Sequence, residues 1–299
     1  MAPYPQRPDE LRGLSLCAGV GGLDLGLHIA EPGYRTVCFV ERNSFAAACL
    51  VARMADTALA PAPIWDDLRS FDGRAWRGRI HIVTAGYPCQ PFALSGHRKG
   101  AQDPRHLWPD VARVVSEVQP EWCFFENVPG HLTLGFRDVV GDLQQLGYLV
   151  AARVVSAAEV GGSHLRERLF ILAHADLQGQ RQQGLHSGRT RGAEVLHRPQ
   201  PGRQADRDQE CGGGLDTVLG SSDRLRLDAS ALPLFPPLPG QFVEWGAALD
   251  ARPDLKPGLD RLDDGLADRL ERSAAAGNGV VPLAAAHAYV ALKAAFQEG

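Results

Sequence analysis

A cysteine between two prolines is the first feature of this 299-residue sequence that could do chemistry. Cys89 lies in the segment 86–92, GYPCQPF, directly after an apolar run and before the basic segment 95–100, SGHRKG. Nearby positive charge favours the thiolate, which is the nucleophilic form of cysteine. The segment therefore predicts a reactive thiol, although a lone cysteine is more often a small buried apolar side chain.

Charged side chains accompany two further apolar runs. Glu126 lies near the end of the run 122–128, so a strand there would deliver a carboxylate to the same sheet edge as Cys89. Arg166 and Arg168 precede the run 169–174. Alternate residues of an extended chain point the same way, so these two guanidinium groups could hold a base or a phosphate. The simpler interpretation is a surface glutamate and salt-bridged surface arginines.

A glycine-rich turn followed by two acids predicts a site for a cofactor that contains a nucleoside. The segment 17–24, CAGVGGLD, follows an apolar run and opens a helical pattern, and its glycines allow the backbone to approach a ligand closely. Glu41 ends the next apolar run, where an acid can hold both ribose hydroxyls, and Asp67 could accept from an adenine amino group. The alternative is a structural turn with two surface acids. Asp24 stands where the dinucleotide pattern has its third glycine, which disfavours a nicotinamide oxidoreductase.

The elements that must position these residues alternate between strand-like and helix-like pieces. Apolar runs typical of strands cover 11–17, 36–41, 80–86, 122–128, 149–156 and 169–174. Helical spacing covers 22–30, 44–54, 107–118, 136–146 and 283–296. This alternation predicts an α/β fold with a doubly wound, mostly parallel sheet covered on both faces. Ligands of such sheets bind at the carboxyl ends of the strands, where the residues above are expected.

The character of the chain changes near residue 176. Residues 177–207 are rich in Gln, Gly and Arg, and 231–240 form a proline-rich connector. The composition of 177–207 fits either a solvated loop or an adaptable basic surface for nucleic acid. We therefore expect one domain from 11–175 plus 270–299, and a separate region from 176–269. The formal net charge of −4 excludes a protein that coats nucleic acid by bulk positive charge, so any contact must come from local basic patches.

Cysteine spacing and hydropathy indicate the environment of the chain. The six cysteines form no CxxC pair and fit no zinc site, so we expect no metal and reduced thiols. The N-terminus has no basic-then-apolar order of a signal peptide, and no apolar run reaches the roughly 20 residues of a membrane helix. A soluble, cytoplasmic protein is expected.

In their order and spacing, these motifs resemble the DNA cytosine-5 methyltransferase family, most closely its phage-type and prophage-type bacterial members. The resemblance rests on LSLCAGVGGLDLGL, PCQPF, DPRHLWP, ENVPG and RERLFIL, and covers about 11–175 and 270–299. It implies the class I S-adenosylmethionine-dependent methyltransferase fold, with 176–269 as a smaller, irregular target-recognition region. The implied reaction transfers a methyl group from S-adenosylmethionine to carbon 5 of cytosine in a specific duplex DNA sequence, leaving S-adenosylhomocysteine.

The resemblance also assigns roles to residues. Cys89 would add to a flipped-out cytosine, Glu126 would bind its ring nitrogen and amine, Arg168 its carbonyl, and Arg166 would support the catalytic loop. Implied cofactor contacts are Cys17, Ala18, Gly19, Gly21, Gly22, Glu41, Asp67, Pro88, Asn278 and Val280. Implied DNA contacts are Gln90, Ser95, His97, Arg98 and Lys99. Cys17 departs from the family, in which a phenylalanine commonly packs on the adenine at this position.

Alternatives with the same fold stay open. One is the same chemistry on transfer RNA, and another is a catalytically weakened DNA-binding relative. For the leading hypothesis we expect a monomer that acts on duplex DNA, away from membranes. The enzyme would either belong to a restriction–modification pair, whose endonuclease acts separately, or stand alone in a phage.

Overall fold

The computed structural model describes residues 10–88, 107–162, 164–176, 194–195, 243, 247, 250 and 278–297. Its strands are β1 (Leu11–Leu16), β2 (Tyr34–Val40), β3 (Ile64–Trp65), β4 (Ile82–Ala85), β5 (Trp122–Asn127), β6 (Tyr148–Ser156), β7 (Glu167–Ala175) and β8 (Glu194–Val195). The longer helices are α1 (Gly22–Ala30), α2 (Ser44–Ala55), α3 (Trp108–Val118), α4 (Phe136–Gln145) and α9 (Pro282–Gln297). Short 3-10 turns include η1 (Leu68–Ser70) and η2 (Gly73–Trp76).

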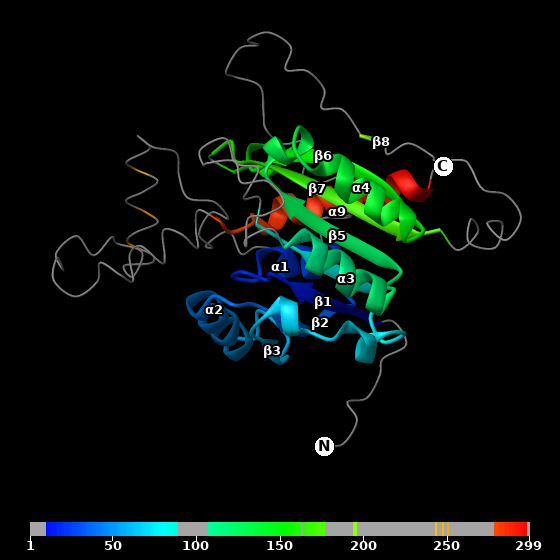
Figure 1. The fold of residues 1–299 in the computed structure, drawn as a ribbon. Helices are drawn as coiled ribbons and strands as arrows, with labels where there is room; N and C mark the ends of the chain where they lie inside the picture. The colour runs from blue at the N-terminus through cyan, green and yellow to red at the C-terminus, as the bar shows by residue number, and fades with distance from the viewer. Residues whose placement is uncertain are drawn as a thin grey trace, which may run out of the picture. The chain divides into compact units, whose positions relative to one another are not determined.

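These strands form one sheet in the order β3-β2-β1-β4-β5-β7-β6-β8 (Figure 1). Strands β1 to β5 pair in parallel, and β7 runs antiparallel to β5. The chain moves outward from β1 to β3 and then returns to place β4 on the other side of β1. This reversal creates a switch point at the carboxyl ends of β1 and β4, which is where ligands bind in doubly wound sheets. The predicted doubly wound, mostly parallel α/β fold is confirmed.

Helices α3 and α4 cover one face of the sheet. In α3 the buried side chains recur at helical spacing on one side, so this face packs on the sheet. They are Trp108, Val111, Val114, Val115 and Val118. The helix ends at Gln119, which has a left-handed backbone (φ 52°) and is followed by Pro120. On this side the ring of Phe125 in β5 meets the ring of Trp108 edge-on, with the two ring centroids 5.6 Å apart.

Helices α1 and α9 pack on the opposite face (Figure 1). Phe124 of β5 points to this side, where its ring stacks on Phe170 and meets Tyr289 of α9 edge-on. Adjacent residues of β5 thus enter two different cores. A strand buried on both faces needs a continuous apolar run, and this explains the sequence pattern of 122–128.

The predicted elements differ from the observed ones mainly at their ends. The two-residue strands β3 and β8 were not predicted, and neither was the antiparallel direction of β7. The chain divides into two compact units, one of 1–155, 167–199 and 279–299, the other of 156–166 and 200–278. The boundary proposed at 176 and 269 stays a prediction, because nearly all of that region lies outside the described residues. Within the described part of the chain, no helix is long and apolar enough to cross a membrane.

Candidate functional site

The glycine-rich turn follows β1 directly. Gly19 and Gly21 have positive φ angles of 55° and 82°, a conformation that glycine adopts without strain, and Gly21 caps the start of α1. Gly22 is needed for another reason: a Cβ atom there would lie 2.5 Å from the carbonyl oxygen of Val280. The turn therefore depends on residues that approach it from the far end of the chain. A Cβ built at Gly19 would meet no atom of the described residues within 4 Å, so they leave the space above this glycine open.

Glu41 joins this turn to the end of β2. One carboxylate oxygen accepts the backbone N–H of Gly19 at 2.7 Å, and the other accepts that of Asn43 at 2.6 Å. Each oxygen keeps a further lone pair with which to accept a hydrogen bond from a hydroxyl group. The two predicted cofactor elements, turn and acid, thus lie in direct contact.

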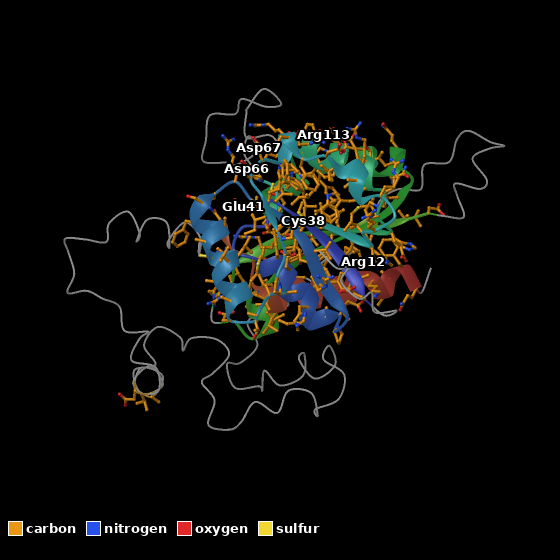
Figure 2. The ribbon with its side chains drawn as sticks, turned by 90° about the horizontal axis from the view of Figure 1, so that it is seen from below. Arg12, Cys38, Glu41, Asp66, Asp67 and Arg113 are labelled. Atoms are coloured by element: carbon orange, nitrogen blue, oxygen red, sulfur yellow. The ribbon has the colours of Figure 1, made fainter. Side chains whose placement is uncertain are left out.

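Asp67 lies at the same edge of the sheet, after β3. Its carboxylate caps η1 by accepting the backbone N–H of Arg69 at 3.0 Å. Figure 2 shows Glu41, Asp66 and Asp67 together at one end of the molecule and Arg12 at the other. The backbone N–H of Glu41 donates to the carbonyl of Trp65 at 2.9 Å, which ties the Asp67 segment to the end of β2.

Cys17 is a neutral thiol at the start of the turn. Burial raises its pKa to about 12, and the negative charges of Glu41 and Asp110 act in the same direction. A thiol with such a pKa is not a nucleophile at neutral pH. Cys17 packs beside the core under α3, so it offers a small apolar contact and no chemistry.

Glu126 and Arg168 form an ion pair between neighbouring strands β5 and β7. Arg168 Nε lies 2.9 Å from Glu126 Oε1, and the two side chains are 16% and 10% exposed. A Cβ atom at Gly86, just after β4, would lie 3.6 Å from both Glu126 Oε2 and the carbonyl oxygen of Cys17. The ends of β1, β4 and β5 therefore converge at Gly86, three residues before Cys89.

The polypeptide that leads to Cys89 is anchored by residues to which the sequence analysis assigned no role. The carbonyl of Tyr87 accepts a hydrogen bond from Asn127 Nδ2 at 3.3 Å, and its hydroxyl lies 3.0 Å from His131 Nε2. The ring of Tyr87 packs on Trp108 and Phe125. In the sequence, these contacts of Tyr87 could have been suspected only from Asn127, which directly follows Glu126 in a motif already singled out.

Of the remaining predicted site residues, the structure describes some and not others. Ala18 and Pro88 lie at the ends of β1 and β4, with Pro88 exposed, and Val280 lies against Gly22. Arg166 and Asn278 belong to the second unit. The others lie outside the described residues: Cys89, Gln90, Ser95, His97, Arg98 and Lys99. Among the side chains that the structure describes, no group of three or more His, Cys, Asp or Glu could hold a metal ion.

Comparisons with known proteins identify the class. The family model for C-5 cytosine-specific DNA methylases matches residues 11–198, and this chain belongs to that family. It is 33% identical over 172 residues to the Type II methyltransferase M.NgoMIV of Neisseria gonorrhoeae, covering 55% of this chain and 52% of that protein. It is also 33% identical over 180 residues to the Type II methyltransferase M.PspPI of Psychrobacter, an alignment that covers 58% of this chain and 41% of that protein.

The solved structure of the S. pombe Dnmt2 methyltransferase matches with a TM-score of 0.47 and 24% identity, over 57% of this chain and 52% of that one. The chain spans about half the length, or less, of the curated relatives named above.

Proposed function

We propose that this chain transfers a methyl group from S-adenosylmethionine to carbon 5 of a cytosine extruded from duplex DNA. One observation carries the proposal: Glu126, nearly buried and paired with Arg168, lies beside Gly86, at the strand end that leads to Cys89. Family membership supports the reaction class, and the names of the curated relatives, Type II methyltransferases, support DNA as substrate. A specific target sequence, a separate endonuclease and a monomeric state stay predictions.

The residues at the carboxyl ends of β1, β2 and β3 fit a cofactor that contains a nucleoside. No described residue fills the space above Gly19, and Glu41 is held by two backbone N–H groups, that of Gly19 in the turn and that of Asn43 before α2. Glu41 would hold the ribose hydroxyls and Asp67 the adenine amino group, with Cys17 as a small apolar contact. When bound, S-adenosylmethionine supplies the methyl group.

The chain's own residues would activate the base. Carbon 5 of cytosine is a weak nucleophile, and addition of the Cys89 thiolate to carbon 6 converts the ring into an enamine. Glu126 would hold a proton at ring nitrogen 3 and accept from the amine, while Arg168 would donate to the ring carbonyl. After methylation, carbon 5 loses its proton to water, and the electron pair expels the thiolate. Extrusion of the base costs a few kcal/mol, which contacts with the DNA backbone must supply.

The ion pair also accounts for how Glu126 is tolerated inside the protein before DNA binds. An unpaired carboxylate in this nearly buried position would be costly, and the guanidinium group of Arg168 offsets that cost. Both groups are already fixed between two hydrogen-bonded strands, so little rearrangement is needed when a base enters.

Cys89→Ser should reduce methyl transfer to background, because a serine hydroxyl is far less nucleophilic than a thiolate. Glu126→Gln should lose about 10²–10⁴-fold in rate, since the amide cannot hold the proton at nitrogen 3. Transfer of a labelled methyl group to duplex DNA and to transfer RNA measures both effects and separates the two substrates.

Cys49→Ser, on α2, is the matched control and should retain the wild-type rate. A Cys89→Ser variant as active as the wild type would rule out the covalent mechanism. Activity on transfer RNA without activity on DNA would rule out the proposed substrate.

A further inference from the structure

The segment that carries Asp67 has little support from its own strand. β3 contributes only two residues to the edge of the sheet, and the chain then leaves the sheet through η1 and η2. Asp67 caps the first of these turns. Something other than β-sheet hydrogen bonding must therefore hold η1 in place.

Arg113 of α3 makes that connection. Its Nη2 donates to the carbonyl of Leu68 at 2.8 Å, and its Nη1 donates to the carbonyl of Phe71 at 2.8 Å. These two carbonyls bracket η1, so one guanidinium group holds both ends of the turn that begins at Asp67. In Figure 2 Arg113 is labelled beside Asp67 along the upper edge of the view.

Glu117, one helical turn further along α3, joins Arg113 in holding the segment after β3, and we call this pair of side chains the clamp. Both of its carboxylate oxygens lie 3.1 Å from Arg113 Nη1, and Oε2 also accepts the backbone N–H of Gly73 at 2.8 Å. The Arg113 side chain is 34% exposed and that of Glu117 is 21% exposed, so the pair is partly shielded from water. The clamp therefore fixes η1 through Arg113 and η2 through Glu117.

The same helix also acts electrostatically on the other side of the proposed cofactor site. Asp110, in the first turn of α3, lies 3.8 Å from Arg113 and acts electrostatically on Cys17 in the glycine-rich turn. One helix thus contacts the 3-10 turns that follow β3 and also carries a charge that acts on Cys17, in the turn that follows β1.

We propose that Arg113, held by Glu117, is a positioning residue for the cofactor: it sets the carboxylate of Asp67 through the carbonyls of η1. This inference rests on the proposed function. The planar guanidinium group reaches two carbonyls and a carboxylate from two nitrogen atoms, whereas a lysine ammonium carries all its N–H donors on one nitrogen and cannot span the same partners. Arg113→Lys keeps the charge and loses this geometry, so it isolates the positioning role.

The test measures binding of S-adenosylhomocysteine to the full chain by calorimetry, together with steady-state methylation of DNA. Arg113→Lys should raise the dissociation constant about tenfold. The KM for S-adenosylmethionine should rise similarly, while kcat at saturating cofactor and the KM for DNA stay within about twofold of the wild type. Arg74→Lys is the control, because Arg74 lies on η2 and pairs with Asp72 of its own loop. It should bind like the wild type.

A double-mutant cycle with Asp67→Ala, which removes the acceptor, separates positioning from general loosening of the fold. If Arg113 acts through Asp67, Arg113→Lys should cost much less affinity in the Asp67→Ala background than alone. Full additivity would overturn the inference, and so would an unchanged dissociation constant for Arg113→Lys. If that variant does not fold, Glu117→Gln weakens the same clamp and takes its place.

Failure of the proposed function gives a different result. A wild-type chain that binds no S-adenosylhomocysteine would refute the cofactor assignment itself. A wild-type chain that binds it, with unchanged binding by Arg113→Lys, would refute only the role of Arg113.

Discussion

Individual buried polar residues hold the glycine-rich turn against the sheet. Asp24, in the first turn of α1, accepts hydrogen bonds from the hydroxyls of Ser15, Tyr34 and Thr36 at 2.8, 2.9 and 2.8 Å. Complete burial raises the pKa of Asp24, and the hydroxyl donors of Ser15 and Thr36 oppose that rise by stabilising the charged form. In the sequence, Asp24 was informative only because it stands where the dinucleotide-binding pattern has its third glycine. Its structural role depends on partners that come from two strands.

His81 provides a test of stability against pH. Its Nδ1 accepts the backbone N–H of Arg12 at 2.9 Å and must be unprotonated to do so. Burial and the charge of Arg12 lower the pKa of His81 below 6.5, while Glu121 and Glu10 partly oppose this. The unfolded chain therefore binds a proton at higher pH than the folded chain. The contribution of His81 is complete above pH 6.5 and is lost as the pH falls through the folded-state pKa.

His81→Gln should flatten this dependence, because the glutamine oxygen also accepts a hydrogen bond but does not titrate. Urea unfolding at pH 7.5 and pH 5 provides the measurement. The wild type should lose more free energy of unfolding between these two pH values than His81→Gln does. This difference should exceed the difference in stability between the two proteins at pH 7.5. Equal losses in both proteins would show that His81 does not contribute.

At the scale of elements, α1 and α9 approach each other through small residues. A Cβ atom at Gly26 would lie 2.6 Å from the Cβ of Ala285 and 2.7 Å from the carbonyl oxygen of Pro282. The alanine-rich composition of α9, which in the sequence indicated only helix propensity, is what allows this close contact. Nothing local to either helix reveals the partner.

Gly26→Ala should destabilise the protein by about 1–3 kcal/mol, since the added methyl group forces the two helices apart. Gly141→Ala on α4 is the control: a Cβ there meets nothing within 4 Å among the residues that the structure describes. That variant should gain about 0.5–1 kcal/mol from improved helix propensity. Chemical denaturation measures both, and a stabilised Gly26→Ala variant would contradict the close packing.

Most elements could be predicted because their signal is local. Burial on both faces gives β4 and β5 continuous apolar runs, and burial on one side gives α3 its helical spacing. β3 escaped prediction because two residues are too short for a periodic pattern, and its pairing is decided by the neighbouring strand β2. The direction of β7 was equally hidden, since the apolar pattern of a strand is the same in both directions.

At the scale of the whole molecule, helix α9 covers one face of a sheet whose strands β1 to β7 all come from residues 11–175. α9 packs on α1 and β7, and its residues Tyr289 and Leu292 are fully buried. The backbone of Val280, just before α9, lies against Gly22 in the glycine-rich turn. The chain's final segment therefore supports both the core and the proposed cofactor site.

Removal of residues 279–299 should abolish the cooperative thermal unfolding transition and the binding of S-adenosylhomocysteine, because the face of α1 that it covers becomes exposed. Calorimetry of the truncated chain measures both, and addition of a peptide of residues 279–299 should restore them. A truncated chain that unfolds as cooperatively as the full one would show that α9 is dispensable.

The sequence by itself determined the doubly wound fold, the family and the choice of residues at the strand ends, because hydrophobic periodicity and motif order are local properties of the chain. Only the tertiary structure decided which of these residues meet. It joined Glu41 to Gly19, paired Glu126 with Arg168, and brought Arg113 to carbonyls 42 and 45 residues away. Such contacts depend on how separate elements pack, and no pattern of neighbouring residues encodes a distance between atoms that approach only in the folded chain.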